Sequence, residues 1–282
     1  MALSHKLSEG KEMTITVNSK DIKTFNFSGG ECHVSIEGVE IGNVIRIEAY
    51  LYSSDDIMCL IMAVDAVRQV NPGSIIDLTI PYFPYARQDR VCNEGEAFST
   101  AVMAGLINAL NCNSVSVVDP HSLVVEQHLD NCHVINQADI IQGIVSDFIV
   151  GQDLTLVSPD KGASEKTRDV ADAIGISGVI SCSKVRDVKT GHITHSEVHG
   201  DVTGKDLIIL DDICDGGRTF TELAKVLKAH GAGRLYLYVT HGIFSKGLDV
   251  LKEHFIHTFC MHTFLETKQI DTDFLTVIGK GE

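Results

Sequence analysis

Short apolar runs rich in β-branched residues alternate along this chain with longer segments whose apolar residues recur at helical spacing. The runs that we expect to form strands are residues 44–51, 75–80, 114–118, 154–157, 178–181, 207–210 and 235–240. The segments that we expect to form helices are residues 55–70, 98–110, 164–174 and 219–230, with further helical patterning around residues 140–148. Such alternation is typical of a parallel sheet covered by helices on both faces, so the sequence predicts an α/β fold.

The length of 282 residues allows two domains. We expect the boundary near Val150, between an N-terminal domain of residues 1–150 and a C-terminal domain of residues 151–282. Two polar stretches, residues 86–96 and 183–199, lie between the expected elements. Polar loops of this length commonly carry function, so both are candidates for a site.

Charge and cysteine content restrict the possible partners and compartment. A formal net charge of -15 argues against a nucleic-acid partner, and it means that any polyanionic substrate needs local cations, backbone amides or metal ions. The eight cysteines include no CxxC pair, which favours free thiols in a reducing compartment. No segment has the apolar length of a membrane span, and the first residues lack the apolar core of a signal peptide. We therefore expect a cytoplasmic protein with no membrane partner.

The segment LIILDDICDGGRTF, residues 207–220, carries the strongest functional signal. Four apolar residues form a strand, Asp211 and Asp212 follow it, and a glycine-containing turn leads into a helix that opens at Thr219. Ligands bind beyond the carboxyl ends of strands in open α/β sheets, and a glycine turn before a helix presents amides to phosphate. Paired acids suit a sugar diol or hydrated Mg²⁺. The structural alternative is an ordinary strand–turn–helix junction with solvent-facing aspartates.

This segment resembles the phosphoribosyl-pyrophosphate loop of type I phosphoribosyltransferases and ribose-phosphate diphosphokinases. Other segments favour the second family. PYFPYARQDR (residues 81–90) resembles its ATP-binding loop, VVDPHS (117–122) its Asp-Leu-His segment, and THGIFS (240–245) a stretch after its last core strand. VSPDKGASEKTRDVADAIG (157–175) and SKVRD (183–187) fall between them in the expected order. The resemblance extends from about Phe27 to the C-terminus and implies two phosphoribosyltransferase-like, Rossmann-like domains, each with a mainly parallel sheet.

The resemblance implies that the C1 hydroxyl of a ribose 5-phosphate unit attacks the β-phosphorus of ATP, so that a diphosphate is transferred and AMP leaves. Positioning and charge neutralisation supply most of the rate in such chemistry, and Mg²⁺ is the implied cofactor. Phe27 and Glu31, in FSGGE, resemble an adenine-binding segment that the family contributes from a neighbouring subunit, which implies a homo-oligomer with a shared site. The remaining implied ATP-binding residues are Arg87, Gln88 and Asp89.

The other roles follow from the same match. The implied catalytic residues are His121, Lys184 and Arg186, and the implied metal-binding residues are Asp119, His121 and Asp160. For Asp160, an acid that stabilises a helix N-terminus is an equally good explanation. The implied ribose-phosphate-binding residues are Asp211, Asp212, Asp215, Gly216, Gly217, Arg218 and Thr219, with Asp211 and Asp212 on the ribose hydroxyls and the others around the 5-phosphate.

The sequence also departs from the family pattern. The additional strand and helix that open family chains have no evident counterpart before Phe27, and Gly29 and Gly30 stand where the family usually has polar side chains. Gly216 replaces the family's threonine and Arg218 its glycine. A lost hydroxyl and an added cation suit a phosphodiester, so ADP-ribose is an alternative acceptor, giving ADP-ribose 1-pyrophosphate in NAD salvage, as in some bacteriophage-encoded relatives.

Two further alternatives belong to other functional classes. A phosphoribosyltransferase would explain residues 211–219 but would leave residues 81–90 without a role. A non-catalytic regulatory or scaffold homologue would usually have lost the active-site side chains that this chain retains.

Overall fold

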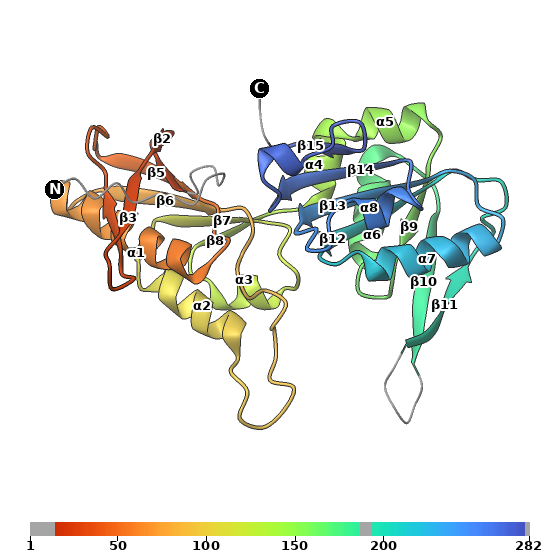
Figure 1. Cartoon of the computed structure of the whole chain (residues 1–282), viewed down its shortest axis with the longest axis horizontal. Helices are drawn as coiled ribbons and strands as arrows, with labels where there is room; N and C mark the ends of the chain where they lie inside the picture. The colour runs from red at the N-terminus through yellow and green to blue at the C-terminus, as the bar shows by residue number, and fades with distance from the viewer. Residues whose placement is uncertain (1–14, 187–192, 280–282) are drawn as a thin grey trace. The chain divides into compact units, whose positions relative to one another are not determined.

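The computed structural model describes residues 15–186 and 193–279, except the side chains of Ile144, residues 184–186 and residues 193–196. The chain divides into two compact units, Met1–Ile135 and Asn136–Glu282 (Figure 1). This division lies before the expected boundary near Val150, because the helix of residues 137–144 and the helix of residues 146–151, which contains Val150, belong to the second unit. The ring of Phe148 lies 5.4 Å from that of Tyr236 and 4.8 Å from that of Phe259.

The first unit contains a six-stranded sheet in the order β2-β1-β5-β6-β7-β8. The strands β5, β6, β7 and β8 are parallel, β1 is antiparallel to β5, and β3 and β4 form a separate antiparallel hairpin. The strands are β1 (Ile15–Val17), β2 (Lys20–Asp21), β3 (Lys23–Asn26), β4 (Cys32–Ser35), β5 (Val44–Ala49), β6 (Ile75–Ile80), β7 (Ser114–Val118) and β8 (Cys132–Ile135). The helices are α1 (Ser54–Val70), α2 (Ser99–Asn108) and α3 (Val124–His128).

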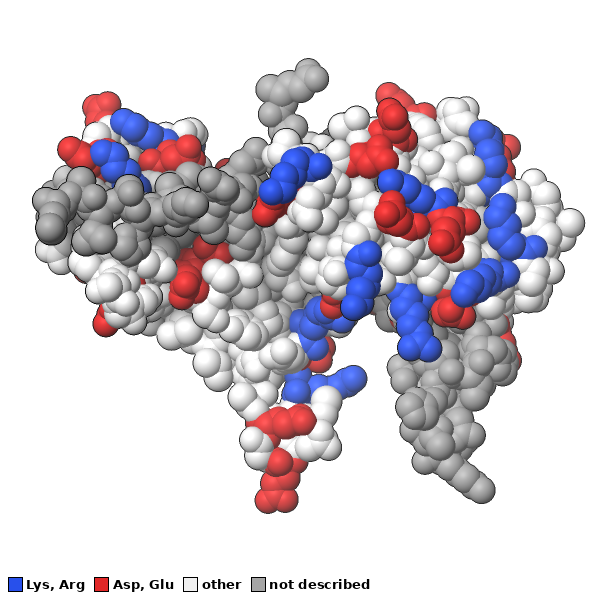
Figure 2. Space-filling model, in the orientation of Figure 1, with Lys and Arg blue, Asp and Glu red and all other residues white. Residues whose placement is uncertain are grey.

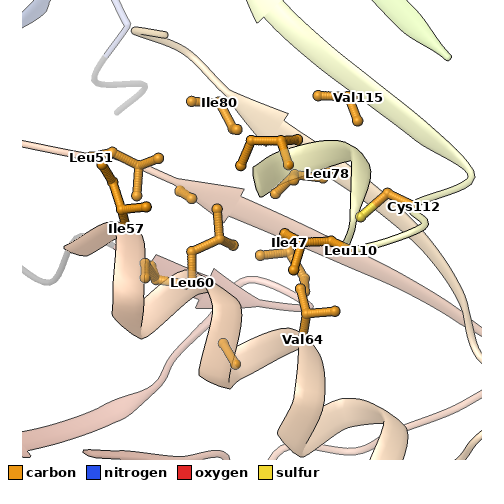
Figure 3. Packing of buried hydrophobic residues seen from close by; sticks show 14 of the residues in the cluster. Ile47, Leu51, Ile57, Leu60, Val64, Leu78, Ile80, Leu110, Cys112 and Val115 are labelled. Atoms are coloured by element: carbon orange, nitrogen blue, oxygen red, sulfur yellow. The ribbon is translucent and has the colours of Figure 1, made fainter. Parts of the chain in front are cut away.

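Helix α1 illustrates how the sequence builds this unit. The Ser53 side chain caps it by accepting a hydrogen bond from the N–H of Asp56. Asp55 and Asp56 in the first turn stabilise the helix further, because their negative charges lie at the positive end of the helix dipole. Its apolar residues recur at helical spacing, so Leu60 and Val64 pack against Ile47 of β5 and its neighbours (Figure 3). The opposite face of β5 is exposed at alternate residues. The expected helical cover on both faces is therefore incomplete in this sheet, since its strands alternate apolar and polar residues.

The second unit contains a seven-stranded sheet in the order β11-β10-β9-β12-β13-β14-β15, parallel except for the antiparallel pair β10–β11. The strands are β9 (Thr155–Ser158), β10 (Val179–Arg186), β11 (Ile193–His199), β12 (Leu207–Cys214), β13 (Leu235–Gly242), β14 (His257–Thr263) and β15 (Leu275–Val277). The helices are α4 (Gln137–Ile144), α5 (Ser146–Gly151), α6 (Ser164–Ile174), α7 (Arg218–Ala229), α8 (Asp249–Lys252) and the 3-10 helix η1 (Thr267–Gln269).

This second sheet is buried on both faces. Every residue of the central strand β13 is buried, and the apolar side of α7 joins the core on one face through Phe220, Leu223 and Leu227. On the other face, Phe148 of α5 packs on Tyr236 and Phe259. The predicted mainly parallel α/β fold is confirmed. No helix in the described ranges is both long enough and apolar enough to serve as a membrane span.

Residues 183–199 differ from the expected polar loop, because the whole of the described part lies in the hairpin β10–β11, in which Ser183 pairs with Glu197. Strands pair through their backbone groups, so a polar stretch can form a hairpin. The sequence of residues 183–199 lacks the hydrophobic period by which strands are usually recognised.

Candidate active site

The first unit brings two of the predicted segments to one edge of its sheet. The loop of residues 81–90 follows β6, and Asp119 and His121 follow the neighbouring parallel strand β7. The Val118 N–H donates to the Pro81 carbonyl at 3.2 Å, so both segments start side by side. Asp119 is buried, with a left-handed φ of 39°, and its N–H donates to Ile135 at the end of β8, whereas His121 is exposed. The carboxyl edge of this sheet thus carries the predicted nucleotide-binding residues.

The loop after β6 is held from beneath by Thr100 of α2, which is fully buried. The Thr100 hydroxyl lies 2.8 Å from the carbonyl oxygen of Tyr85 and 2.9 Å from that of Gln88, and its amide donates to Gln88 at 3.3 Å. The side chains of Arg87 and Gln88 are exposed. The main chain of the loop is therefore anchored while these side chains face outward. Thr100 was not identified from the sequence, because a threonine in the first turn of a helix has no distinguishing pattern.

The hairpin β3–β4 presents the predicted adenine-binding residues. Phe27 is 54% exposed, and its ring lies 5.0 Å from that of Phe25 and 5.9 Å from that of His33. The Phe27 N–H donates to the Glu31 carbonyl, and Glu31 is exposed. Gly30 between them has φ of +99°, a conformation that only glycine adopts readily. The turn geometry thus accounts for one of the two glycines that replace polar family residues.

In the second unit, the predicted phosphate turn lies between β12 and α7. Strand β12 continues past Leu210 to Cys214, because its pairing with β13 extends to Cys214 and Gly242. Gly217 has φ of +76°, and a Cβ there would lie 3.1 Å from Leu251, so the turn requires glycine. Among the described residues no side chain caps the start of α7, where Arg218 and Thr219 are exposed. An uncapped helix start after a glycine turn fits an anionic ligand.

The segment after β13 is hydrogen-bonded to this turn through residues 243–245, and we call this set of contacts the clasp. The amides of Ile243 and Phe244 donate to the Cys214 carbonyl at 2.8 and 3.1 Å, and the Ser245 amide donates to the Asp215 carbonyl at 3.0 Å. The Ser245 hydroxyl donates to Oδ1 of Asp215 at 2.6 Å. These contacts give the matched stretch THGIFS a structural role that the sequence did not reveal, since only the motif and not Ser245 was singled out.

Asp211 lies close to two other carboxylates, those of Asp212 and Asp160. Burial, followed by the charge of Asp212 and more weakly that of Asp160, holds the pKa of Asp211 well above its usual range. The Asp212 N–H donates to Oδ1 of Asp211 at 3.0 Å. A cation or a donor hydroxyl would relieve this repulsion, so the pair fits both Mg²⁺ and a sugar diol.

Asp160 has contacts that match its structural alternative. Its Oδ1 accepts the N–H groups of Gly162 at 3.0 Å and Ala163 at 3.2 Å, just before α6 begins. Within residues 15–186 and 193–279, no three histidine, cysteine, aspartate or glutamate side chains are grouped so as to hold a metal ion by themselves. Mg²⁺ characteristically takes one or two carboxylates and completes its shell with water and substrate phosphates, so the residues present still fit that ion.

Gln137 is a further residue of this site that the sequence did not identify. Its side chain is buried at the start of α4, where Nε2 donates to the Asp211 carbonyl at 2.9 Å and lies 3.4 Å from the Thr240 hydroxyl. These contacts join residues that are far apart in the sequence and support the end of β12 from a neighbouring helix. Lys184 and Arg186 lie in β10, where their backbones pair with Ser196 and Ile193, and their side chains lie outside the described part.

Two mainly parallel sheets, with an acidic pair and a glycine turn at the carboxyl edge of the second, define a two-unit α/β protein of the phosphoribosyltransferase-like class. A ribose-phosphate pyrophosphokinase of Shewanella oneidensis is 33% identical over 225 residues, which cover 78% of this chain and 70% of the relative. One from Granulibacter bethesdensis is 31% identical over 221 residues, covering 77% and 69%. The chain belongs to the ribose-phosphate pyrophosphokinase family.

Family models agree with this assignment in both units. The model for the N-terminal domain of ribose phosphate pyrophosphokinase matches residues 2–110, and the model for the phosphoribosyl synthetase-associated domain matches residues 162–269. The likeness therefore begins well before Phe27, in a segment where residues 15–26 form β1, β2 and β3. The crystal structure of phosphoribosylpyrophosphate synthetase from Mycobacterium smegmatis has a TM-score of 0.77 and 23% identity, covering 91% of this chain and 85% of that one, which supports the fold.

Proposed function

We propose that this protein is a Mg²⁺-dependent diphosphokinase that transfers the β,γ-diphosphate of ATP to the C1 hydroxyl of ribose 5-phosphate. The products are phosphoribosyl pyrophosphate and AMP. Membership of the ribose-phosphate pyrophosphokinase family supports the reaction. The observation that carries the proposal is the turn of residues 215–217, which follows the strand that carries Asp211 and Asp212 and is held by the hydrogen bond from Ser245 to Asp215.

The second unit binds the acceptor in this proposal. Amides of the turn and of the uncapped start of α7 hold the 5-phosphate, around Asp215, Gly216, Gly217, Arg218 and Thr219. Asp211 and Asp212 hold the ribose hydroxyls, directly or through Mg²⁺-bound water. The raised pKa of Asp211 supports this role, because a carboxylate in such surroundings gains more than an exposed one from a donor or a cation.

The first unit binds ATP in this proposal. Arg87 binds phosphate oxygens through a bidentate contact, and Gln88 and Asp89 contact the nucleotide. His121 and Asp119 act on the phosphates and their metal ion. Phe27 and Glu31 of a second copy contact adenine, which makes the enzyme a homo-oligomer. Lys184 and Arg186 neutralise charge on the transferring diphosphate. Mg²⁺, when bound, screens the phosphate charge, and Asp160 is its proposed contact near the sugar.

AMP release tests the proposal directly. The purified protein is incubated with ATP, Mg²⁺ and ribose 5-phosphate, without any nucleobase, and AMP is measured. Lys184→Ala should lower kcat by at least roughly a hundredfold while the protein stays folded. A folded wild-type protein that releases no AMP with any acceptor would support a non-catalytic homologue instead. Turnover that requires a nucleobase would indicate a phosphoribosyltransferase.

A second candidate acceptor is ADP-ribose, giving ADP-ribose 1-pyrophosphate for NAD salvage. The observation that favours it is that the backbone does not require glycine at position 216, since an added Cβ would make ordinary contacts with Lys246 and Ser245 at 3.5 and 3.7 Å. The absence of a side chain there, where the family carries a threonine, is therefore a feature of the site and not of the turn geometry. Comparing kcat/KM for the two acceptors decides between them.

We further propose that the protein works in the cytoplasm. All eight cysteines are free, and six of them are buried, which fits a reducing compartment.

A further inference from the structure

Gly216 is not required by the shape of its own turn. Its backbone lies outside the left-handed region, and a Cβ would make ordinary contacts, 3.5 Å to Cγ of Lys246 and 3.7 Å to Oγ of Ser245. Gly217 beside it differs on both counts, with a positive φ and a contact of 3.1 Å. The missing side chain therefore leaves a small space on the turn, and the aliphatic stem of Lys246 borders that space.

The backbone on either side of Lys246 is held in place. Ser245 is bound to Asp215 through both its amide and its hydroxyl, at 3.0 and 2.6 Å. Gly247 follows with φ of +73°, and its amide donates to Phe244 at 2.8 Å. The lysine thus projects from a short, hydrogen-bonded turn and not from a long loop. Its position beside the phosphate turn is set by the clasp itself.

Lys246 has no acidic partner in the part of the chain that the structure describes, and it is exposed. Arg218, at the start of α7, has the carboxylate of Glu222 nearby. On the face shown in Figure 2, basic and acidic side chains are interspersed over the second unit. With a net charge of -15, the protein cannot attract a phosphate by its overall field, so cations next to the site must do so.

We propose that Lys246 binds the 5-phosphoryl group of the acceptor and replaces the side-chain donor that Gly216 lacks. This inference rests on the proposed function of the same turn. A lysine ammonium is a compact charge with three donors on a flexible stem, which suits phosphate oxygens in either a terminal monophosphate or a diphosphate linkage. The structural alternative is that the stem only covers Gly216 while the ammonium is solvated.

Two substitutions distinguish the contribution of the Lys246 ammonium group from that of its aliphatic stem. Lys246→Met keeps the apolar stem and removes the charge, and Lys246→Arg keeps a charge. Equilibrium dialysis with ribose 5-phosphate and with ADP-ribose measures binding without turnover, and AMP release measures KM for each acceptor and for ATP. In Lys246→Met, the Kd and KM of the acceptor should rise roughly ten- to hundredfold, as for one lost charge-assisted bond, with the KM for ATP unchanged. Lys246→Arg should recover most of the affinity.

Lys225→Met on the exposed side of α7 is the matched control and should bind both acceptors as the wild type does. Acceptor binding by Lys246→Met that equals the wild type, or a wild type that binds neither acceptor, overturns the inference. A wild type that binds acceptor in a Lys246-dependent way but releases no AMP overturns the proposed function alone. The acceptor whose affinity falls more in Lys246→Met is the one whose phosphate Lys246 binds.

Discussion

The hydroxyl of Ser245 donates a 2.6 Å hydrogen bond to Oδ1 of Asp215, thirty residues earlier in the chain. The two residues meet because β12 and β13 are adjacent and parallel, so the segments that leave their carboxyl ends share one edge of the sheet. The turn that we assign to the 5-phosphate is therefore stabilised by a neighbouring strand end as well as by its own helix.

Ser245→Ala should loosen this turn. Loss of one hydroxyl donor to a carboxylate at the surface should raise the KM for the acceptor roughly three- to tenfold, with little change in the KM for ATP. Steady-state kinetics with each substrate varied separately provides the measurement. Ser245→Thr retains the hydroxyl and should stay close to the wild type. An unchanged acceptor KM in Ser245→Ala would show that the clasp does not order the turn.

Thr100→Val should weaken ATP binding by a different route. The substitution keeps the volume of the buried side chain but leaves the carbonyls of Tyr85 and Gln88 without their hydroxyl donor. We expect a loss of about 1–2 kcal/mol in unfolding free energy and a several-fold rise, roughly three- to tenfold, in the KM for ATP. Thr100→Ser is the control. Equal rises in the KM for both substrates would instead indicate a general loss of structure.

Asp211→Asn should change how stability depends on pH. Because the pKa of Asp211 is raised in the folded protein, the folded state binds more protons than the unfolded state above the ordinary carboxyl pKa of 3.8. The free energy of unfolding of the wild type should therefore fall as pH rises from about 4 toward the folded-state pKa. Asparagine does not titrate, so the unfolding free energy of the variant should increase relative to that of the wild type as the pH rises through this range. Turnover of the variant should fall at least roughly a hundredfold.

Urea unfolding at a series of pH values, without Mg²⁺ or substrate, measures this effect of Asp211. Asp169→Asn, at an exposed position of α6, is the matched control and should run parallel to the wild type. A constant difference between Asp211→Asn and the wild type at all pH values would argue against a raised pKa.

Neighbouring glycines of the turn should respond in opposite ways to the same change. Gly217→Ala forces a side chain into the left-handed region and against Leu251, so it should cost about 1–2 kcal/mol or more of unfolding free energy. Gly216→Ala meets only ordinary contacts and should stay within about 0.5 kcal/mol of the wild type. Thermal unfolding of the two variants side by side checks this. Equal losses would mean that the turn has a different backbone conformation.

Several elements were predictable from the sequence because their signals are local. Residues 75–80, 114–118 and 164–174 form the expected strands and helix with the expected limits, as β-branched runs or apolar residues at helical spacing indicate. The start of β10 was expected at residues 178–181, but its continuation to Arg186 and strand β11 were missed, because residues 183–199 form a polar stretch of the sequence. The boundary between the units lies between Ile135 and Asn136, because the packing of α4 and α5, and not their composition, assigns them to the second unit.

The sequence by itself determined the positions of the main strands and helices and the order of the family motifs, because both are written in residues that are neighbours along the chain. Only the tertiary structure decided which side chains support those motifs. Gln137 reaches the Asp211 carbonyl, and Ser245 and Lys246 lie beside the phosphate turn, because strand order brings distant segments together. Contacts of this kind depend on which strands are adjacent in the sheet, and that adjacency is not encoded in any single stretch of the chain.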